Sequence, residues 1–238
     1  MARRDDAKPP RVGRYEVVAE LGRGWLGTIV EARDPRLGRT VALKLLNEGL
    51  GERHTRRLMR EARACARLSH PNVVQVYEVG EVEGRRFIAM ERVEGQTLRA
   101  WQQRRPGWRR CVRVYRGIAE GLAAAHAASL VHRDLKPEHC ILDRAGTPRV
   151  LGFGRVASVG AEAEPAAGED TETETQWGTP EYMPPEQVLG GEADALGDQY
   201  SFCVSLFEAV YGERPFPADG EGARLRAKMT GRLPPAPR

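Results

Sequence analysis

Three glycines, a lysine and a glutamate are spaced along this chain as a phosphate-binding site requires. Gly22, Gly24 and Gly27 form a GxGxxG pattern between two stretches that alternate apolar and polar residues. Glycine at such positions lets backbone N–H groups approach a phosphate closely. Lys44 follows 17 residues after Gly27, and Glu61 follows 17 residues after Lys44 in a stretch with helical spacing. A strand lysine that faces a helix glutamate forms an ion pair that can direct its ammonium at phosphates, so these residues could bind a phosphate group together.

The glycine pattern by itself fits more than one local structure. The chain contains 26 glycines, so a bare match to GxGxxG can also be an ordinary hairpin turn. A dinucleotide-binding fold needs a helix directly after the glycines. Here the strand-like stretch RTVALKLL follows instead, which argues against that fold and leaves the hairpin turn and the phosphate loop open.

Further motifs follow in a fixed order along the chain. They are His132-Arg133-Asp134-Leu135-Lys136-Pro137, then Gly152-Phe153-Gly154, then Gly178-Thr179-Pro180, and finally Pro184-Pro185-Glu186. Together with the glycines, Lys44 and Glu61, this set resembles the eukaryotic-like Ser/Thr protein kinases of bacteria over residues 14 to about 231. The resemblance implies an α+β, two-lobed protein-kinase fold with a β-rich N-lobe and a helical C-lobe.

The resemblance also implies roles for individual residues. Asp134 would accept the proton of the substrate hydroxyl, Lys136 would lie beside the transferred phosphate, and Thr179 would help to accept Ser or Thr substrates. Asp198 would anchor the turn that contains Asp134. The residues expected to bind ATP are Leu21, Gly22, Gly24, Gly27, Ile29, Ala42, Lys44, Glu61, Met90, Glu91, Val93 and Ile141. Within this set, the glycines would cover the phosphates, Ile29, Ala42 and Ile141 would enclose adenine, and Met90, Glu91 and Val93 would form the gatekeeper and hinge.

Two positions depart from the family pattern, and both normally bind magnesium. Gly152 stands where the family has the aspartate of its DFG motif, and His139 stands where it has an asparagine. We therefore predict no metal ligand at these positions and treat magnesium as doubtful, although His139 can be interpreted either as a capping or space-filling residue or as a ligand of a softer metal. Trp25, at the tip of the glycine loop, adds a bulky ring where the family mostly has a small residue.

This combination predicts a kinase-like domain that binds ATP but is catalytically impaired, with a signalling or scaffold role. The alternative is an active Ser/Thr kinase with weak or atypical metal dependence, because Asp134 and Lys136 are retained. The expected partner is a protein substrate or a signalling protein.

The elements that must position these residues can be predicted from periodicity. Residues 14–46 alternate around the glycines and predict three strands, residues 51–69 predict a helix, and residues 70–93 predict two more strands. From Thr97 the pattern becomes helical, over residues 97–105, 109–130 and 198–212. We expect a flexible basic tail over residues 1–13, an N-lobe over 14–93 and a C-lobe over 94–238. The last helices of the family's C-lobe lie beyond the resemblance, so a truncated C-lobe is expected.

Charge and composition limit the functional classes. Residues 99–116 carry seven arginines and no acid, which we interpret as a solvated face and not as a nucleic-acid site. Residues 161–176 carry six acids and no base, lie within the activation segment expected at 152–186, and are expected to be mobile. No stretch is long and apolar enough to predict a membrane span. Four dispersed cysteines without a CxxC pair predict free thiols and a cytoplasmic location.

Overall fold

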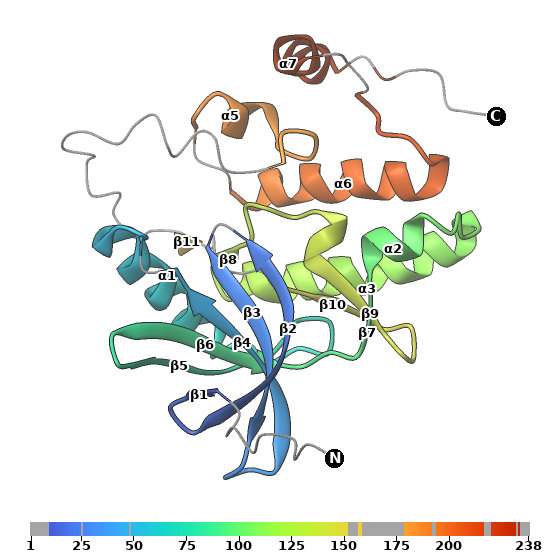
Figure 1. Ribbon diagram of the computed structural model, residues 1–238. Coiled ribbons are helices and arrows are strands. Elements are labelled where there is room, and N and C mark those ends of the chain that lie inside the picture. The colour runs from blue at the N-terminus through green and yellow to red at the C-terminus, as the bar shows by residue number, and fades with distance from the viewer. Residues whose placement is uncertain are drawn as a thin grey trace, which may run out of the picture. The chain divides into compact units, whose positions relative to one another are not determined.

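Strands dominate the first third of the chain and helices most of the rest (Figure 1). The computed structural model describes residues 10–24, 26–47, 49–151, 157–158, 179–191, 194–216, 220–231 and 233. The chain divides into two units. The first comprises Met1–Arg67 and Gln75–Arg92, and the second comprises Leu68–Val74 and Val93–Arg238.

The first unit is built on an antiparallel sheet with the strand order β1-β2-β3-β4-β6-β5. Its strands are β1 (Arg11–Val12), β2 (Tyr15–Gly24), β3 (Gly27–Asp34), β4 (Arg39–Leu46), β5 (Val76–Val82) and β6 (Arg85–Glu91). Alternation places Val41, Leu43 and Leu45 of β4 on one buried face. The three strands predicted before residue 47 and the two predicted within residues 70–93 are confirmed.

One helix, α1 (Glu52–Cys65), follows β4 in the first unit. Leu58 and Met59 of α1 pack with Leu46 of β4 in a small buried cluster. Full burial of one such side chain contributes on the order of 1.5–3 kcal/mol, which is more than the intrinsic preference of any one residue for a helix. Packing against the sheet therefore stabilises α1 and fixes where Glu61 lies.

The second unit contains short strands and most of the helices. Its elements are β7 (Gly95–Thr97), α2 (Leu98–Gln102), α3 (Trp108–Ala127), β8 (Leu130–Val131), η1 (Pro137–His139), β9 (Cys140–Asp143), β10 (Pro148–Val150), β11 (Ala157–Ser158), α5 (Pro185–Val188), α6 (Ala195–Tyr211) and α7 (Glu221–Thr230). Strands β10, β9 and β7 form one sheet, and β11 pairs with β8. The helices predicted over residues 97–105, 109–130 and 198–212 are confirmed as α2, α3 and α6, whereas the short strands between them were not predicted.

Helices α3 and α6 pack against each other in the interior of the second unit. The Tyr115 hydroxyl of α3 donates to the Ser205 carbonyl of α6 at 2.8 Å, and its ring meets Phe202 edge to face. Tyr115 and Ile118 are almost fully buried. This contact brings Asp198, at the start of α6, close to the segment that follows α3.

The four cysteines are free thiols, as predicted, and three of them are buried. Cys203 on α6 is the exposed one. Within the described parts of the chain, none of the helices combines the length and the apolar character needed to cross a bilayer. The tail up to residue 9, Trp25, the Gly152-Phe153-Gly154 motif and the acidic stretch 161–176 lie outside the described residues.

Candidate active site

The glycine pattern forms the end of the β2–β3 hairpin, where Gly24 pairs with Gly27. A Cβ atom on Gly22 or Gly24 would meet no atom within 4 Å. A Cβ on Gly27, whose φ is +150°, would lie 1.9 Å from the Leu45 carbonyl oxygen of the neighbouring strand. Gly27 is thus required by the close approach of two strands, whereas Gly22 and Gly24 leave open space beside the backbone.

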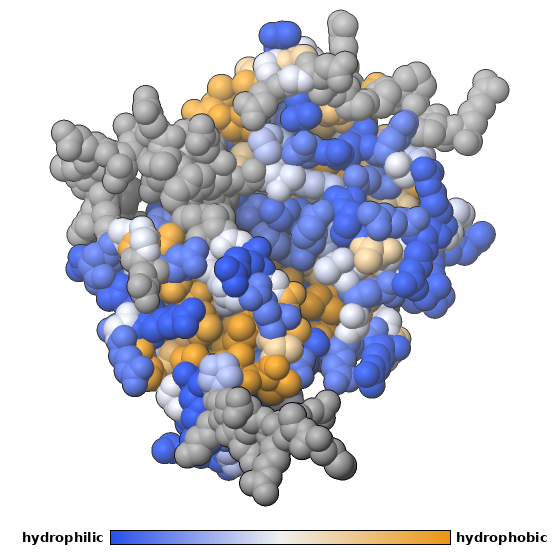
Figure 2. Space-filling model, viewed as in Figure 1, coloured by the Kyte–Doolittle hydropathy of each residue, from blue (hydrophilic) through white to orange (hydrophobic). Residues whose placement is uncertain are grey.

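Several of the residues predicted to bind ATP share one face of this sheet. Ile29 pairs directly with Lys44, and Ala42 pairs directly with Met90. Directly paired residues lie on the same face, and Ala42 and Lys44 are two positions apart on β4. Gly22 pairs with Ile29 and joins the same face. Figure 2 shows apolar side chains gathered over the part of the molecule in which Figure 1 places this sheet.

Two more of the residues predicted to bind ATP, Leu21 and Glu61, lie on the glycine hairpin and on α1. Leu21 is partly exposed on β2, at 42%. Glu61 is buried on α1, and its Oε1 lies 3.1 Å from the Arg57 Nε one turn earlier. The predicted ion pair between Lys44 and Glu61 stays a prediction.

The remaining predicted nucleotide residues lie near or beyond the end of β6. The Glu91 N–H donates to the Gln75 carbonyl at 2.8 Å, which closes the end of the β5–β6 pair. Val93 and Ile141 belong to the second unit, where Val93 is buried and Ile141 lies on β9 opposite Thr97.

Asp134, Lys136 and Thr179 come together within the second unit. The Lys136 Nζ donates to the Thr179 Oγ1 at 2.8 Å and lies 3.7 Å from the Asp134 Oδ1. An ammonium between a carboxylate and a hydroxyl can bind an anion while the carboxylate accepts a proton. This arrangement suits a base that acts on an alcohol.

His139 follows Asp134 by five residues and has its ring beside the Asp134 backbone. Its Nδ1 lies 2.7 Å from the Asp134 carbonyl oxygen, and because a carbonyl can only accept, Nδ1 carries the proton. Burial, together with the nearby His132 and Lys136, lowers the pKa of His139 to about 4, against the opposing effect of Asp134. At neutral pH the ring is therefore uncharged, with its lone pair on Nε2.

These donors do not fit a magnesium ion. Magnesium prefers oxygen ligands in octahedral geometry, and His139 offers an imidazole nitrogen. Among the residues that the structure describes, no cluster of three or more His, Cys, Asp or Glu side chains could hold a metal. We therefore derive no step of the chemistry through a metal.

The turn that contains Asp134 is held by Asp198. The Asp198 carboxylate accepts the N–H groups of His132 and Arg133, both at 2.7 Å, and the Nε2 proton of His126 at 2.8 Å. Although burial opposes it, these hydrogen bonds lower the pKa of Asp198. They also support Arg133 in a left-handed conformation, with φ at 63°, which is unfavourable for a side chain with a Cβ. These hydrogen bonds agree with the expectation that Asp198 anchors the turn that contains Asp134.

Sequence reasoning missed a second network, centred on Arg99. Its Nε lies 2.7 Å from the Glu138 carboxylate, and its Nη1 lies 3.0 Å from the Glu208 carboxylate. The Tyr182 hydroxyl bonds to both Arg99 and Glu208. The interpretation of residues 99–116 as a solvated face is wrong for Arg99 and for Trp101, which is 3% exposed. The helical spacing of Leu98, Trp101 and Gln102 was the available signal, since all three are buried on α2.

The β-sheet unit with its glycine hairpin and the Asp134–Lys136–Thr179 cluster are features of one family. Residues 15–233 match the protein kinase domain, and the chain belongs to this family. It is 36% identical over 214 residues to "Probable serine/threonine-protein kinase pknA2" of Bifidobacterium longum, covering 87% of this chain and 28% of the relative. It is 39% identical over 210 residues to "Serine/threonine-protein kinase PknL" of Mycobacterium tuberculosis, covering 87% of this chain and 51% of the relative.

A third relative extends the match along the chain. "Serine/threonine-protein kinase pkn3" of Myxococcus xanthus is 37% identical over 239 residues, covering 94% of this chain and 42% of the relative. The chain thus spans about a quarter to a half of the length of these relatives.

Proposed function

We propose that this chain is a Ser/Thr protein kinase domain that binds ATP but transfers its phosphate poorly or not at all. The observation that carries the proposal is the state of His139: an uncharged imidazole, bonded to the Asp134 backbone, at a position where the family holds a metal. Gly152, at the other metal position, has no side chain. Phosphoryl transfer depends mainly on positioning and charge neutralisation, so losing the ligands for both metals removes a large part of catalysis.

ATP binding relies on residues that the chain retains. Ile29, Ala42, Lys44 and Met90 share a face of the sheet, so the lysine and three apolar residues that suit a purine are on the same face. The space beside Gly22 and Gly24 allows phosphates to approach the backbone. ATP supplies the phosphate, and Lys44 binds it.

A second candidate function is an active kinase with weak or atypical metal dependence. The contact of Lys136 with Thr179, beside Asp134, favours it, because this is the arrangement of a competent base and cation. In an active kinase of this kind, Asp134 accepts the proton of a Ser or Thr hydroxyl. We infer that either form works on or with a protein partner in the cytoplasm, and not with nucleic acid.

Two measurements separate these functions. Ligand that binds the native state raises the melting temperature by mass action, so we expect millimolar ATP to raise it with or without EDTA. Lys44→Met should abolish the shift, while Arg60→Met, at an exposed position on α1, should keep it. No shift for the unchanged protein would contradict ATP binding. Transfer of labelled phosphate at about 1–100 per second, absent in Asp134→Asn, would instead establish the active kinase.

A further inference from the structure

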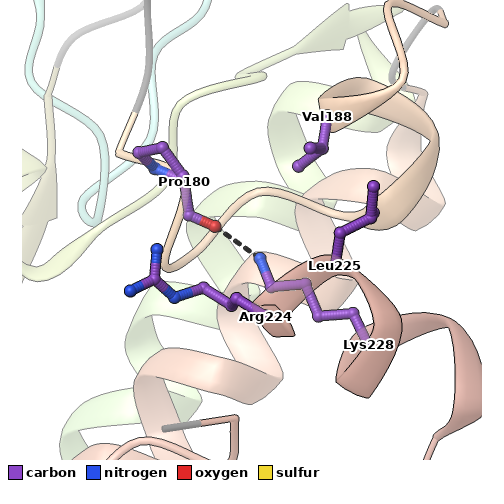
Figure 3. Close-up of a pocket in the computed structure, with 5 residues that line it drawn as sticks. All are labelled: Pro180, Val188, Arg224, Leu225 and Lys228. Atoms are coloured by element: carbon purple, nitrogen blue, oxygen red, sulfur yellow. Dashed lines mark hydrogen bonds between the residues drawn. The ribbon is translucent and has the colours of Figure 1, made fainter. Parts of the chain in front are cut away.

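Lys228 is a buried lysine in a chain that carries most of its positive charge on arginine. Only four of the 37 basic residues are lysines: Lys8 in the tail, Lys44 and Lys136 in the motifs, and Lys228. Lys228 lies on α7 and is 5% exposed. Its Nζ donates to the carbonyl oxygens of Pro180 and Met183, at 2.5 and 2.6 Å, and Figure 3 shows the first of these bonds.

The two carbonyls belong to residues 179–184, which form neither helix nor strand. Buried backbone carbonyls need donors, and this segment obtains them from several sources. The Thr179 carbonyl accepts the Tyr182 N–H, and the Tyr182 carbonyl accepts the Ser201 hydroxyl. Lys228 supplies the donors for the Pro180 and Met183 carbonyls, from a helix more than forty residues away in the sequence.

Placing an ammonium here has an energetic cost. Burial and, to a smaller extent, the charge of Arg224 together lower the pKa of Lys228 to about 8, against the opposing effect of Glu181. An apolar side chain would avoid that cost but would leave two carbonyls without donors. A lysine ammonium has three N–H donors on one atom, so it can converge on two carbonyls in a way that a planar guanidinium cannot.

The segment also carries a residue of the candidate active site. Thr179 is adjacent to Pro180, and its hydroxyl accepts from the Lys136 ammonium. A bond that fixes the Pro180 carbonyl therefore restricts where the Thr179 hydroxyl can lie.

We propose that Lys228 is a positioning residue, which holds residues 179–183 through the carbonyls of Pro180 and Met183 and thereby presents the Thr179 hydroxyl to Lys136. The inference rests on the proposed function in one respect, namely that Thr179 belongs to the kinase active site. Its test needs neither ATP binding nor phosphotransfer. The proposed function is tested separately, by the melting temperature with ATP and by transfer of labelled phosphate, so the two can fail independently.

The first test is hydrogen exchange of the Tyr182 backbone amide, which donates to the Thr179 carbonyl, in the whole chain. Lys228→Met keeps the length of the side chain and removes its donors, so exchange of this amide should accelerate at least about tenfold. Amides of α3 should be unchanged. Arg226→Met, at an exposed position of the same helix, is the matched control and should leave both regions unchanged. Unchanged exchange of the Tyr182 amide in Lys228→Met would overturn the proposal.

A second variant guards against failure of the first to fold. Lys228→Gln keeps two N–H donors without the charge and should give a smaller acceleration at the Tyr182 amide than Lys228→Met gives. An acceleration as large as that of Lys228→Met would overturn the role of the donors. A double-mutant cycle with Thr179→Val then separates positioning from general support. If Lys228 acts through Thr179, the shifts in urea midpoint of the two variants will not add. Strictly additive shifts would overturn the positioning role.

Discussion

The Nδ1 proton of His139 bonds to the carbonyl oxygen of Asp134 at 2.7 Å, so the ring is tied to the backbone of the residue proposed as the base. Nδ1 also lies 3.6 Å from the Asp134 Oδ2. At that distance the two side chains would form an ion pair only if the imidazole were charged. With its pKa lowered to about 4, the ring is neutral near pH 7. His139 thus stabilises the loop through a hydrogen bond to its backbone.

The lowered pKa of His139 predicts how stability changes with pH. The folded pKa is about 4 and the ordinary value is 6.5, so between these values the unfolded chain binds more protons. The free energy of unfolding of the wild type should therefore fall, relative to that of His139→Asn, as the pH drops from 6.5 through 4. Urea denaturation of both proteins from pH 4 to 7.5 measures the difference. Parallel curves would show that His139 keeps its ordinary pKa.

Restoring both metal positions should restore phosphotransfer. We expect Gly152→Asp combined with His139→Asn to increase transfer of labelled phosphate by orders of magnitude, and each change alone to do much less, because metal ligands act as a unit. Trp25→Gly is added in parallel, since a bulky ring at the glycine loop can block a repaired site. The same changes in an Asp134→Asn background provide the blank. A triple variant that binds ATP and stays inactive would place the defect outside the metal positions.

Asp198→Asn should destabilise the protein by about 3 to 5 kcal/mol, the range for breaking a buried charged network. The asparagine side chain has a single acceptor oxygen, whereas the Asp198 carboxylate accepts from three donors: the backbone N–H groups of His132 and Arg133 and the ring of His126. Its NH2 group would therefore face a group that also donates. Chemical denaturation measures the loss. Asp194→Asn is the matched control: Asp194 caps α6 by accepting from Leu196 and Gly197, and asparagine caps a helix about as well. A similar loss for both variants would contradict the anchoring role.

Gly27→Ala and Gly24→Ala should differ sharply. The Gly27 Cβ would overlap the Leu45 carbonyl, so we expect a loss of about 2 kcal/mol or more. The Gly24 Cβ would enter open space, so its loss should stay below about 1 kcal/mol. Thermal denaturation without ligand compares the two. Equal losses would mean that the two strands do not approach as closely as described.

The sequence was sufficient for features that repeat along the chain or that form a motif. Alternation predicts β2, β3 and β4. Because β3 and β4 are adjacent in the sequence and form a hairpin, Ile29 is paired with Lys44. Contacts between distant segments leave no such pattern. Arg99 lies in a run of arginines that looks solvated, yet it meets carboxylates 39 and 109 residues later.

The contact of Lys228 with residues 180 and 183 could not be predicted from the sequence either. Its partners are backbone carbonyls, which every residue has, so no particular residue type near Pro180 or Met183 reveals the contact. The scarcity of lysine in the chain was the available hint. It singles out Lys228 but says nothing about what the side chain binds.

The distribution of thiols equips this protein for selective chemical labelling. Cys65, Cys111 and Cys140 are buried, and burial raises the pKa of all three, to about 12 for Cys65 and Cys140. Cys203 is exposed on α6, and although burial raises its pKa as well, its sulfur is the one that a reagent can reach in the folded chain. A maleimide dye should therefore couple to the native chain at one known position. Such a dye would give a fluorescence reporter for nucleotide or partner binding without any engineered cysteine.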